Sequence, residues 1–517
     1  MILKYTLLAA IFVSSSHCAN ILGIIPTPSY SHQIAYTPLW KELSLRGHKV
    51  TVITTNPLND PKLVNLTEID MRFLYSYFTD ISKLAEEKMN MWNMHSIFAE
   101  LALVIEEAIL SSPPVQELIH NKNTFDVVLV EFLYPEFMNF AKMYDCPSII
   151  ISSLDVFGPL HRAVGNQAYT SLHPEIGTPF TAPLSFKERI INTIYSWYVS
   201  YYYSYVSYPK RENLMRRHLN VTLNTDTLIS EADMLFLNVN PAIHTVRAVG
   251  ATTINIGGYR ETLSSKSLPQ DLQDFLDAAT DGFIYFSLGS NVKSKELAGP
   301  TFTAIFETLK EIPFKVLWKF ENDNLPGKSE NIKIIKWAPQ EKVLCTLGIT
   351  QSQNAHPNIK LFITQGGLQS MEEGIYREVP FVVIPFFADQ EQNARLMESK
   401  GIARIVQRKP SMNKEELKNA ILEVIHNPRY KNSVKTLRRQ VLDSPTSGLE
   451  SAVWWTEYVI RHKGAKHLRN PAADLPLYQY FLLDVISFLV LATASALWVA
   501  SFLMKKLYKL IWYEIEK

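Results

Sequence analysis

Short apolar runs alternate with amphipathic stretches along most of this chain. In the first half, an apolar run at residues 21–25 and a polar turn at 29–31 precede an amphipathic stretch over 32–46 that ends at Gly47. We predict a strand, a helix and then a second strand at 49–53. Further strands are predicted at residues 125–130, 148–151, 283–286, 315–318, 332–335, 362–364 and 381–384. Strands that alternate with helices form parallel sheets, so the pattern predicts an α/β fold with one sheet in each half.

The most informative segment covers residues 362–390 and reads FITQGGLQSMEEGIYREVPFVVIPFFADQ. Gly366 and Gly367 allow a sharp turn between the strand and the helix that follows. The apolar positions of this helix recur at helical spacing and should face the sheet, namely Leu368, Met371 and Ile375. Gln369 and Glu373 lie four positions apart and therefore share the opposite face.

Ligands of an open parallel sheet bind in the crevice beyond the carboxyl ends of its strands. Gln365, the first turn of the helix, and the pair Asp389 and Gln390 all follow strand ends, so we expect them at one edge. The helix N-terminus suits a phosphate. Glu373 suits ribose hydroxyls, and the acid–amide pair suits the hydroxyls of a sugar.

These residues belong to a longer motif that resembles the donor signature of the UDP-glycosyltransferases, which include animal glucuronosyltransferases, plant glucosyltransferases and insect relatives. The matching features are Gly366-Gly367 with Glu373 six positions on, Val379-Pro380, Pro385, Asp389-Gln390, Asn393-Ala394, and the upstream WAPQ at residues 337–340. The resemblance covers essentially the whole chain. It implies a GT-B fold, with two Rossmann-like parallel-sheet domains facing a cleft, and a C-terminal transmembrane helix. It also implies that Trp337 stacks on uracil and that Gln340 reaches the base or ribose.

A small-residue turn, Ser287 to Ser290, follows the strand at 283–286. Ser290 would hydrogen-bond a diphosphate there, although a simple strand-to-helix connection explains the same residues. The expected donor site consists of Ser290, Trp337, Gln340, Gln365, Gly366, Gly367, Gln369, Glu373, Asp389 and Gln390.

The candidate catalytic base is His32, which follows the first strand and begins the first predicted helix. A helix N-terminus disfavours the imidazolium form and would keep the ring available as a base. Glu131 ends another strand at the same expected edge and would accept a hydrogen bond from the other ring nitrogen. By resemblance, His32 deprotonates an acceptor hydroxyl, which attacks the anomeric carbon and expels UDP with inversion.

The sequence departs from the family pattern at three places. Glu131 stands where vertebrate members commonly have Asp, and Gln365 stands where vertebrate and plant members have His. Gln at this position resembles the invertebrate members, many of which prefer UDP-glucose. The segment Cys345 to Asn354 inserts about ten residues between WAPQ and the pair His356-Pro357. This insertion is a surface loop, a misassigned exon boundary or the mark of an inactive variant.

The composition fits a membrane-bound enzyme of two domains. The chain has 517 residues, of which 47% are hydrophobic, so it can form two cores and further segments. A net charge of +1 argues against nucleic acid as a partner. Only Cys146 and Cys345 remain once a signal peptide is removed, too few for a disulfide framework.

Both ends of the chain indicate a membrane compartment. Residues 1–18 look like a cleavable signal peptide. Residues 485–504 carry no charge and are long enough to cross a bilayer as a helix. Lys505, Lys506 and Lys509 follow directly, which predicts a cytosolic tail and lumenal catalytic domains in the endoplasmic reticulum membrane. Sequons at Asn65 and Asn220 agree with that address.

We therefore predict six segments: a signal peptide (1–18), an acceptor-binding domain (19–260), a UDP-sugar-binding domain (261–450, after a linker near 261–266), a terminal helix and membrane approach (451–484), a transmembrane helix (485–504) and a tail (505–517). The tyrosine-rich stretch at 187–208 has three interpretations: an apolar acceptor pocket, a membrane surface, or ordinary helix packing.

The predicted function is inverting transfer of a hexose from a UDP-sugar to small lipophilic alcohols or phenols. Glucose is favoured and glucuronate is the other candidate. We expect no metal and no cofactor besides the UDP-sugar co-substrate, and we leave open a homo- or hetero-oligomer. The alternative is a non-catalytic UDP-sugar binder or partner subunit whose donor site is distorted by residues 345–354.

Overall fold

The computed structural model describes residues 18–78, 89–121, 124–219, 223–258, 268–297, 299–345, 356–408 and 412–516. Four sequence predictions therefore fall wholly or largely outside the described residues: the signal peptide, the linker near 261–266, the sequon at Asn220, and the insertion from residue 346 onward. The chain forms two compact units, Met1–Arg469 and Asn470–Lys517.

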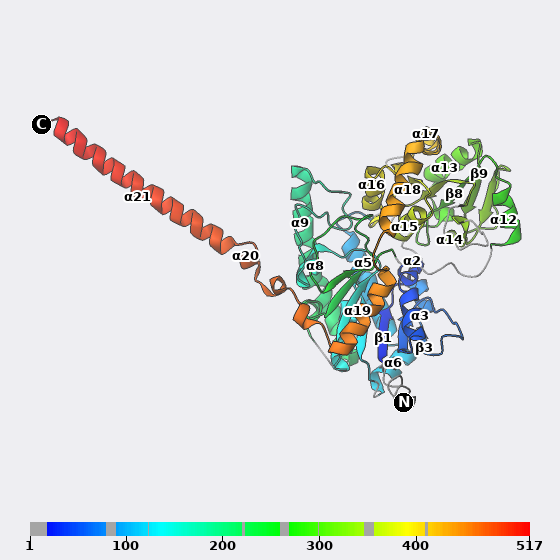
Figure 1. The fold of residues 1–517 in the computed structure, drawn as a ribbon, viewed down its shortest axis with the longest axis horizontal. Coiled ribbons are helices and arrows are strands. Elements are labelled where there is room, and N and C mark those ends of the chain that lie inside the picture. The colour runs from blue at the N-terminus through cyan, green and yellow to red at the C-terminus, as the bar shows by residue number, and fades with distance from the viewer. Residues whose placement is uncertain are drawn as a thin grey trace, which may run out of the picture. The chain divides into compact units, whose positions relative to one another are not determined.

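The first half of the larger unit contains seven described strands, all parallel, in the order β3-β2-β1-β4-β5-β6-β7. Figure 1 labels β1 and β3 of this sheet. Both faces of this sheet are covered, since Leu22 and Ile24 of β1 pack into one core cluster and Ile21 and Ile25 into another. This explains the nearly continuous apolar runs in the sequence. The strands are β1 Asn20–Ile25, β2 Lys49–Thr54, β3 Leu66–Asp70, β4 Val127–Glu131, β5 Ser148–Ser152, β6 Met234–Leu237 and β7 Thr253–Asn255.

The helices of this half are α2 Tyr30–Ile34, α3 Thr37–Leu45, α5 Met94–Leu110, α6 Pro113–His120, α7 Asn139–Met143, α8 Gly158–Ala163, α9 Phe186–Tyr202, α10 Tyr208–Leu219 and α11 Thr225–Ser230. Short 3₁₀ turns lie at Arg72–Phe78 (η1) and Pro135–Met138 (η2), and a π-helical turn, η3 Tyr203–Ser207, joins α9 to α10.

The single helix predicted over residues 32–46 is two helices, α2 and α3. Pro38 lies in the first turn of α3. A proline there has no N–H to donate back to the preceding turn, so a continuous helix would lose a hydrogen bond and clash, whereas a new helix tolerates it. His32 consequently sits in a helix of only five residues. His32 therefore does not begin a long helix, as the sequence predicted, but lies inside a short one.

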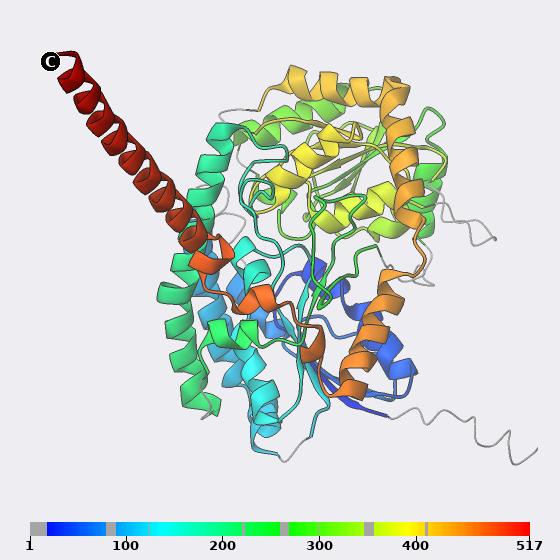
Figure 2. The same cartoon turned by 60° about the vertical axis from the view of Figure 1, so that its left-hand side comes forward.

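The second half contains six described parallel strands in the order β10-β9-β8-β11-β12-β13, and Figure 2 shows helices on both sides of this sheet. The strands are β8 Phe283–Ser287, β9 Lys315–Lys319, β10 Ile332–Ile335, β11 Ile359–Thr364, β12 Phe381–Val383 and β13 Ala403–Ile405. The helices are α12 Gln270–Asp277, α13 Gly299–Glu311, α14 Gln340–Val343, α15 Leu368–Tyr376, α16 Gln390–Ser399, α17 Lys414–His426 and α18 Pro428–Leu442, with a 3₁₀ turn at Ser294–Glu296 (η4).

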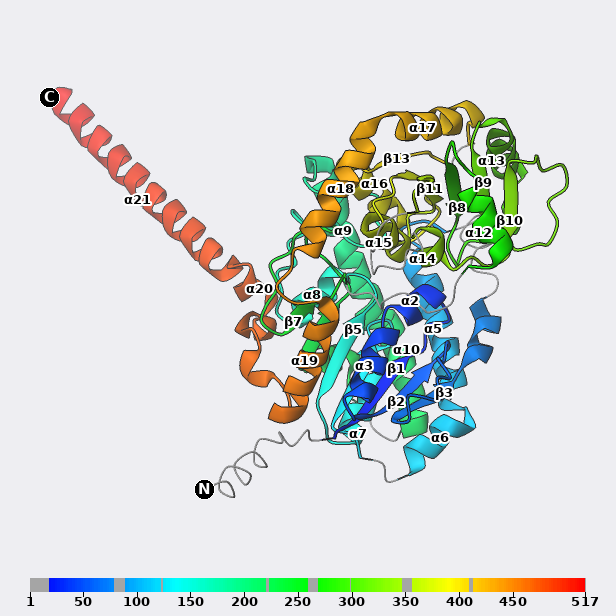
Figure 3. The same cartoon turned by 45° about the vertical axis from the view of Figure 1, so that its right-hand side comes forward.

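After α18 the chain returns to the first sheet as α19, Gly448–His462, followed by a 3₁₀ turn at Lys466–Leu468 (η5). Ala452, Val453 and Val459 of α19 are buried in the same cluster as Ile21 and Ile25 of β1. Figure 3 shows α19 beside α3 on this face, and Arg46 and His48 lie within ion-pair distance of Glu457. The last helix of the larger unit therefore belongs to the core of the first half.

The smaller unit consists of a 3₁₀ turn at Pro471–Asp474 (η6), a short helix α20, Leu477–Tyr480, and α21, Leu483–Ile515. Within the described part of the chain, Leu483–Tyr513 is the one helix long and apolar enough to cross a membrane, and an 18-residue stretch of it has a mean hydropathy of 2.1. The predicted span at 485–504 lies inside it, and the helix continues through Lys505, Lys506 and Lys509 into the predicted tail.

Each sheet reverses its strand order at one point, between β1 and β4 in the first sheet and between β8 and β11 in the second. A parallel sheet opens a crevice at such a switch point, because the connections on its two sides run to opposite faces. The predicted catalytic residues follow β1 and end β4, and the predicted donor turns follow β8 and β11. Both sets therefore stand at switch points.

Candidate active site

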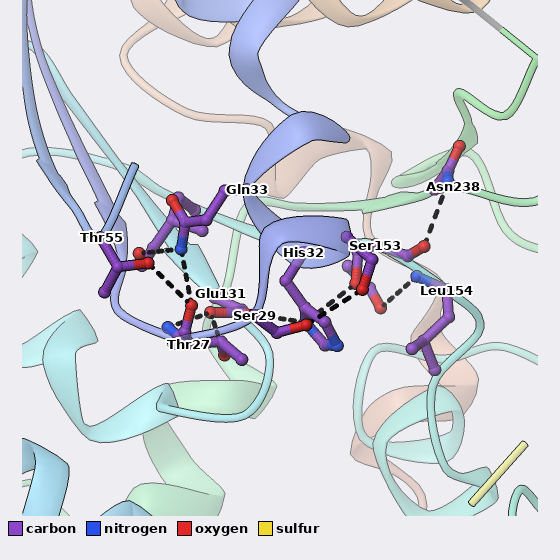
Figure 4. A network of polar contacts seen from close by, with 12 residues as sticks. Thr27, Ser29, His32, Gln33, Thr55, Glu131, Ser153, Leu154 and Asn238 are labelled. Atoms are coloured by element: carbon purple, nitrogen blue, oxygen red, sulfur yellow. Dashed lines mark hydrogen bonds and ion pairs between the residues drawn. The ribbon is translucent and has the colours of Figure 1, made fainter. Parts of the chain in front are cut away.

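The switch point of the first sheet holds a histidine–carboxylate pair. His32 Nδ1 lies 2.7 Å from Glu131 Oε1 (Figure 4). Glu131 is fully buried, and the side chain of His32 is 16% exposed. A buried carboxylate facing Nδ1 places the proton of a neutral imidazole on Nδ1 and leaves Nε2 with its lone pair. Nε2 makes no hydrogen bond to any described residue and can accept a proton from a ligand.

Glu131 is itself held in place from β1. Thr27, two residues beyond that strand, donates to Glu131 Oε2 through its backbone N–H (3.2 Å) and its hydroxyl (2.7 Å). Gln33 donates to the carbonyl oxygens of Ile25 and Thr27, which fixes the turn that carries Thr27. Carboxylates fixed in this way orient the histidine that they face.

Ser153, one residue beyond β5, is the third polar group at His32. Its hydroxyl lies 3.1 Å from Nδ1, and its carbonyl oxygen accepts from Asn238 Nδ2 at 3.1 Å (Figure 4). The same carbonyl accepts from Gln369 Nε2 of α15 at 3.3 Å. Ser153 thus contacts both His32 of the candidate catalytic pair and the helix that opens the predicted donor site.

The donor turn of the second sheet is built around Gln365. Gly289 and Gly366 have φ values of +73° and +88°, a left-handed conformation that favours glycine. A Cβ atom on Gly289 would lie 2.3 Å from Gln365 Nε2, and one on Gly367 would lie 2.8 Å from it. Gln365 is buried and its Oε1 accepts from the Thr364 hydroxyl at 2.9 Å. The amide therefore fills the space between the turns after β8 and β11.

The predicted nucleoside residues lie next to one another. Gln340 Nε2 donates to Glu373 Oε2 (2.5 Å) and to the Ser370 hydroxyl (3.1 Å). Trp337 is 51% exposed, with Lys319 Nζ 5.6 Å from the centre of its ring. The half-exposed indole three residues before Gln340 offers a stacking surface, and the hydrogen-bonded Gln340 and Glu373 offer partners for a ribose.

Asp389 and Gln390 follow β12. Asn393 Nδ2 donates to Asp389 Oδ2 (2.7 Å) and to the carbonyl of Gly366 (3.0 Å), which ties Asp389 to the glycine turn. Burial raises the pKa of Asp389, whereas the hydrogen bond from Asn393 and the charge of His32 act in the opposite direction. Gln390 Oε1 already accepts from the backbone N–H groups of Phe386 and Phe387, so only its Nε2 is left for a ligand.

Three contacts bring the two switch points together. The Ser29 hydroxyl donates to Asn291 Oδ1 at 3.1 Å, and Gln369 donates to Ser153. The ring of Tyr30 meets Trp337 edge-on, with centroids 5.0 Å apart and planes at 87°. Burial raises the pKa of Tyr30, and the nearby carboxylates of Glu373 and Glu341 raise it further.

Ser290 is the predicted donor residue whose surroundings say least about a ligand. Its hydroxyl donates to Asn291 Oδ1 at 3.3 Å, the same oxygen that accepts from Ser29. It lies next to Gly289 at the switch point. Its hydroxyl shares the Asn291 oxygen with Ser29 of the first half and thereby belongs to the contact between the halves.

The chain matches a family model across almost its full length. Residues 20–516 match the model described as UDP-glucoronosyl and UDP-glucosyl transferase. This chain belongs to that family.

Curated relatives of this glycosyltransferase cover nearly all of it. UDP-glycosyltransferase UGT5 of Dactylopius coccus is 31% identical over 96% of this chain and 94% of its own length. UDP-glucosyltransferase 2 of the same insect is 31% identical over 98% and 96%. Human UDP-glucuronosyltransferase 2B7 is 28% identical over 94% and 93%. The prediction of an invertebrate-like UDP-glycosyltransferase is confirmed.

Solved structures agree on the fold. The structure of TcCGT1 in complex with UDP superposes with a TM-score of 0.55 at 15% sequence identity, covering 86% of this chain and 100% of that chain. The predicted GT-B architecture is thereby confirmed.

Several residues of this glycosyltransferase site were missed from the sequence. Thr27, Ser153 and Asn291 each follow a strand that borders a switch point or lies next to one. Their position after a strand end was a usable signal, because side chains there share one edge of the sheet. Tyr30 had no such signal, since its partner Trp337 lies in the other half of the chain.

Proposed function

We propose that this UDP-glycosyltransferase transfers a hexose, with glucose favoured, to the hydroxyl group of a small lipophilic alcohol or phenol, with inversion and with His32 as the general base. The observation that carries the proposal is the 2.7 Å contact between His32 Nδ1 and the buried Glu131, which leaves Nε2 to face a ligand. General base catalysis of this kind contributes roughly 10²- to 10⁴-fold.

In the proposed reaction, the acceptor O–H gives its proton to His32 Nε2 as its oxygen attacks the anomeric carbon of the donor. The new carbon–oxygen bond forms on the face opposite the leaving group, and the bond to UDP breaks with its electron pair. UDP departs as the anion. Glu131 keeps its negative charge beside Nδ1 and stabilises the imidazolium that forms.

The donor would lie across the second switch point. We assign uracil to the ring of Trp337, and the ribose to Gln340 and Glu373, which already lie side by side. The diphosphate would meet the glycine turn and the N-terminus of α15, where backbone N–H groups favour anions. The residues assigned to it are Ser290, Gln365, Gly366, Gly367 and Gln369.

The hexose would meet Asp389 and the remaining Nε2 of Gln390. A glucuronate carboxylate would need a cation here. Arg377 follows α15, about 14 Å along the helix from Leu368 at 1.5 Å per residue. Arg395 is exposed and pairs with Glu391 at 3.0 Å. Neither favours glucuronate, and the insect relative named as a UDP-glucosyltransferase agrees with glucose.

We further propose that α21 anchors the enzyme in the endoplasmic reticulum membrane with the larger unit in the lumen. Its apolar span is followed by Lys505, Lys506 and Lys509, and basic residues favour the cytosolic side. Protease added to sealed microsomes should remove only residues beyond Met504. Digestion of the larger unit without detergent would refute this topology.

Microsomes containing the full chain, incubated with UDP-glucose or UDP-glucuronate and a panel of phenols, would test the reaction directly. Mass spectrometry should find mainly glucosides, and His32→Ala should bind UDP but form almost no conjugate. Preferential glucuronides would overturn the sugar assignment.

UDP binding without any conjugate would instead support the non-catalytic alternative, which depends on the insertion at residues 345–354. The backbone on either side of that insertion meets directly, as His356 N–H donates to the carbonyl of Leu344 at 3.0 Å, so nothing in the described residues favours a distorted site.

A further inference from the structure

The tyrosine-rich stretch forms α9 and η3, and its outward face is apolar. Ile190, Ile194, Trp197, Tyr201 and Tyr205 recur at spacings of three or four residues, and between 46% and 73% of each is exposed. We call these five residues the apolar stripe. Residues three and four apart share one face of a helix, so the stripe is continuous.

The inward face of the same helix carries polar groups. Asn192 is buried and hydrogen-bonds the backbone of Thr170, His173 and Glu175, and Ser196 donates to Glu175 at 2.6 Å. A helix on the surface of a globular unit normally places its apolar side inward. In α9 the inward side combines Tyr195 and Val199 with the polar Asn192 and Ser196, whereas the outward stripe is apolar and exposed, so packing within this unit does not account for it.

The exposed surface of this segment has a marked charge pattern. Between Phe186 and Lys210 the exposed residues are the stripe, Phe186, Pro209, Lys187 and Lys210. The two lysines carry the charges of this exposed set, and Glu188 and Arg189 beside Lys187 are partly exposed. Tryptophan and tyrosine favour the boundary between lipid headgroups and acyl chains. Lysines at both ends of an apolar helix face suit anionic headgroups.

The chain also provides a reason for this face to meet lipid. The segment from Asn470 to Leu482 connects the larger unit to α21. Thirteen residues span at most about 45 Å when fully extended. When α21 crosses a bilayer, the larger unit cannot move further from its surface than this.

We propose that the apolar stripe of α9 and η3 inserts into the headgroup region of the membrane, as a second contact in addition to α21. Lys187 and Lys210 then face the phosphate groups at the two ends of the stripe. The occupant of this face is a lipid surface.

The full chain reconstituted into vesicles of phosphatidylcholine and phosphatidylserine provides the test. A lipid-soluble photoactivated carbene probe, followed by peptide mapping, should label α21 and the apolar stripe, while the exposed face of α17 stays unlabelled. The double variant I194E/W197E should lose the label on α9 and keep it on α21. The matched control L45E/V64E places the same charges at two other exposed apolar positions, 61% and 85% exposed, and should leave both labels unchanged.

Both variants change exposed side chains, and UDP binding checks that each remains folded. Labelling confined to α21 in the unchanged protein would overturn the proposal. So would a Tyr201→Cys variant that forms disulfide-linked dimers in the vesicles while the stripe stays unlabelled, because the face would then be covered by a second copy of the chain.

Discussion

The geometry of the candidate catalytic pair, His32 and Glu131, leads to an unusual prediction for Glu131→Gln. The backbone N–H of Thr27 can only donate, and it points at Oε2 from 3.2 Å with the Thr27 hydroxyl at 2.7 Å. The amide oxygen of a glutamine must therefore take the Oε2 position. Its NH₂ group then faces His32 Nδ1, which has to accept, so the ring proton moves to Nε2. Nε2 of His32, which should receive the proton of the acceptor hydroxyl, then has no lone pair to accept it.

The expected loss is large. In a Ser-His-Asp triad the equivalent change to the wrong tautomer lowers kcat about 10⁴-fold, which corresponds to about 5.4 kcal/mol at 1.36 kcal/mol per factor of ten. Glu131→Ala should lose less, although it removes more atoms. The Ser153 hydroxyl, 3.1 Å from Nδ1, can still accept the Nδ1 proton and preserve the useful tautomer.

The assay is kcat for phenol glucosylation at saturating donor near neutral pH, in Glu131→Gln, Glu131→Ala and Glu131→Ala/Ser153→Ala. UDP affinity, measured by calorimetry, should be the same in all three because the pair belongs to the first sheet. The double variant should fall below Glu131→Ala. If Glu131→Gln is as active as Glu131→Ala, the tautomer argument is refuted.

Three further predictions concern the donor side. Trp337→Ala should weaken UDP binding about 5- to 150-fold, since aromatic–base stacking is worth roughly 1–3 kcal/mol, and Trp337→Phe should lose less. If calorimetry gives Trp337→Ala the same UDP affinity as the unchanged enzyme, stacking on this ring is contradicted. Gly289→Ala should displace Gln365 and raise the KM for the donor, whereas Gly299→Ala, whose Cβ would meet nothing within 4 Å, should leave it unchanged. Asp389→Asn should abolish transfer yet stabilise the fold at neutral pH: the pKa of Asp389 is raised in the folded state, so ionisation above about pH 4 costs the native protein stability that the variant keeps. If the Tm of Asp389→Asn differs from that of the unchanged enzyme by the same amount at pH 4 and at pH 7, this prediction is refuted.

The strands were largely predictable because buried parallel strands leave continuous apolar runs between turn residues. The break between α2 and α3 was also within reach, since Pro38 marks a restart. The helical pattern of residues 32–46 masked it, because amphipathic spacing alone does not register a missing N–H.

The surroundings of α15 were harder to predict. The sequence predicted only that Gln369 and Glu373 share the face opposite the sheet, and the burial of Ser370, Glu372 and Glu373 was not foreseen. The reason is tertiary: Gln340 covers this side from another segment of the chain, and Ser153 reaches its first turn from the first half. Contacts between residues 30 positions apart, as for Gln340 and Ser370, or 216 positions apart, as for Gln369 and Ser153, leave no local pattern.

The return of α19 to the first sheet has a consequence for biosynthesis. On the face of the first sheet that α3 covers only in part, the area under α19 stays open until residues 448–462 have been made, after the whole second half. The ribosome adds the apolar α21 only some twenty residues later. The first half therefore cannot complete its core while the chain is growing, and its final closure coincides with the arrival of the membrane segment. A transcript cut short between residues 394 and 448 would yield a product whose apolar face is left for chaperones, even though every residue named at both switch points is present.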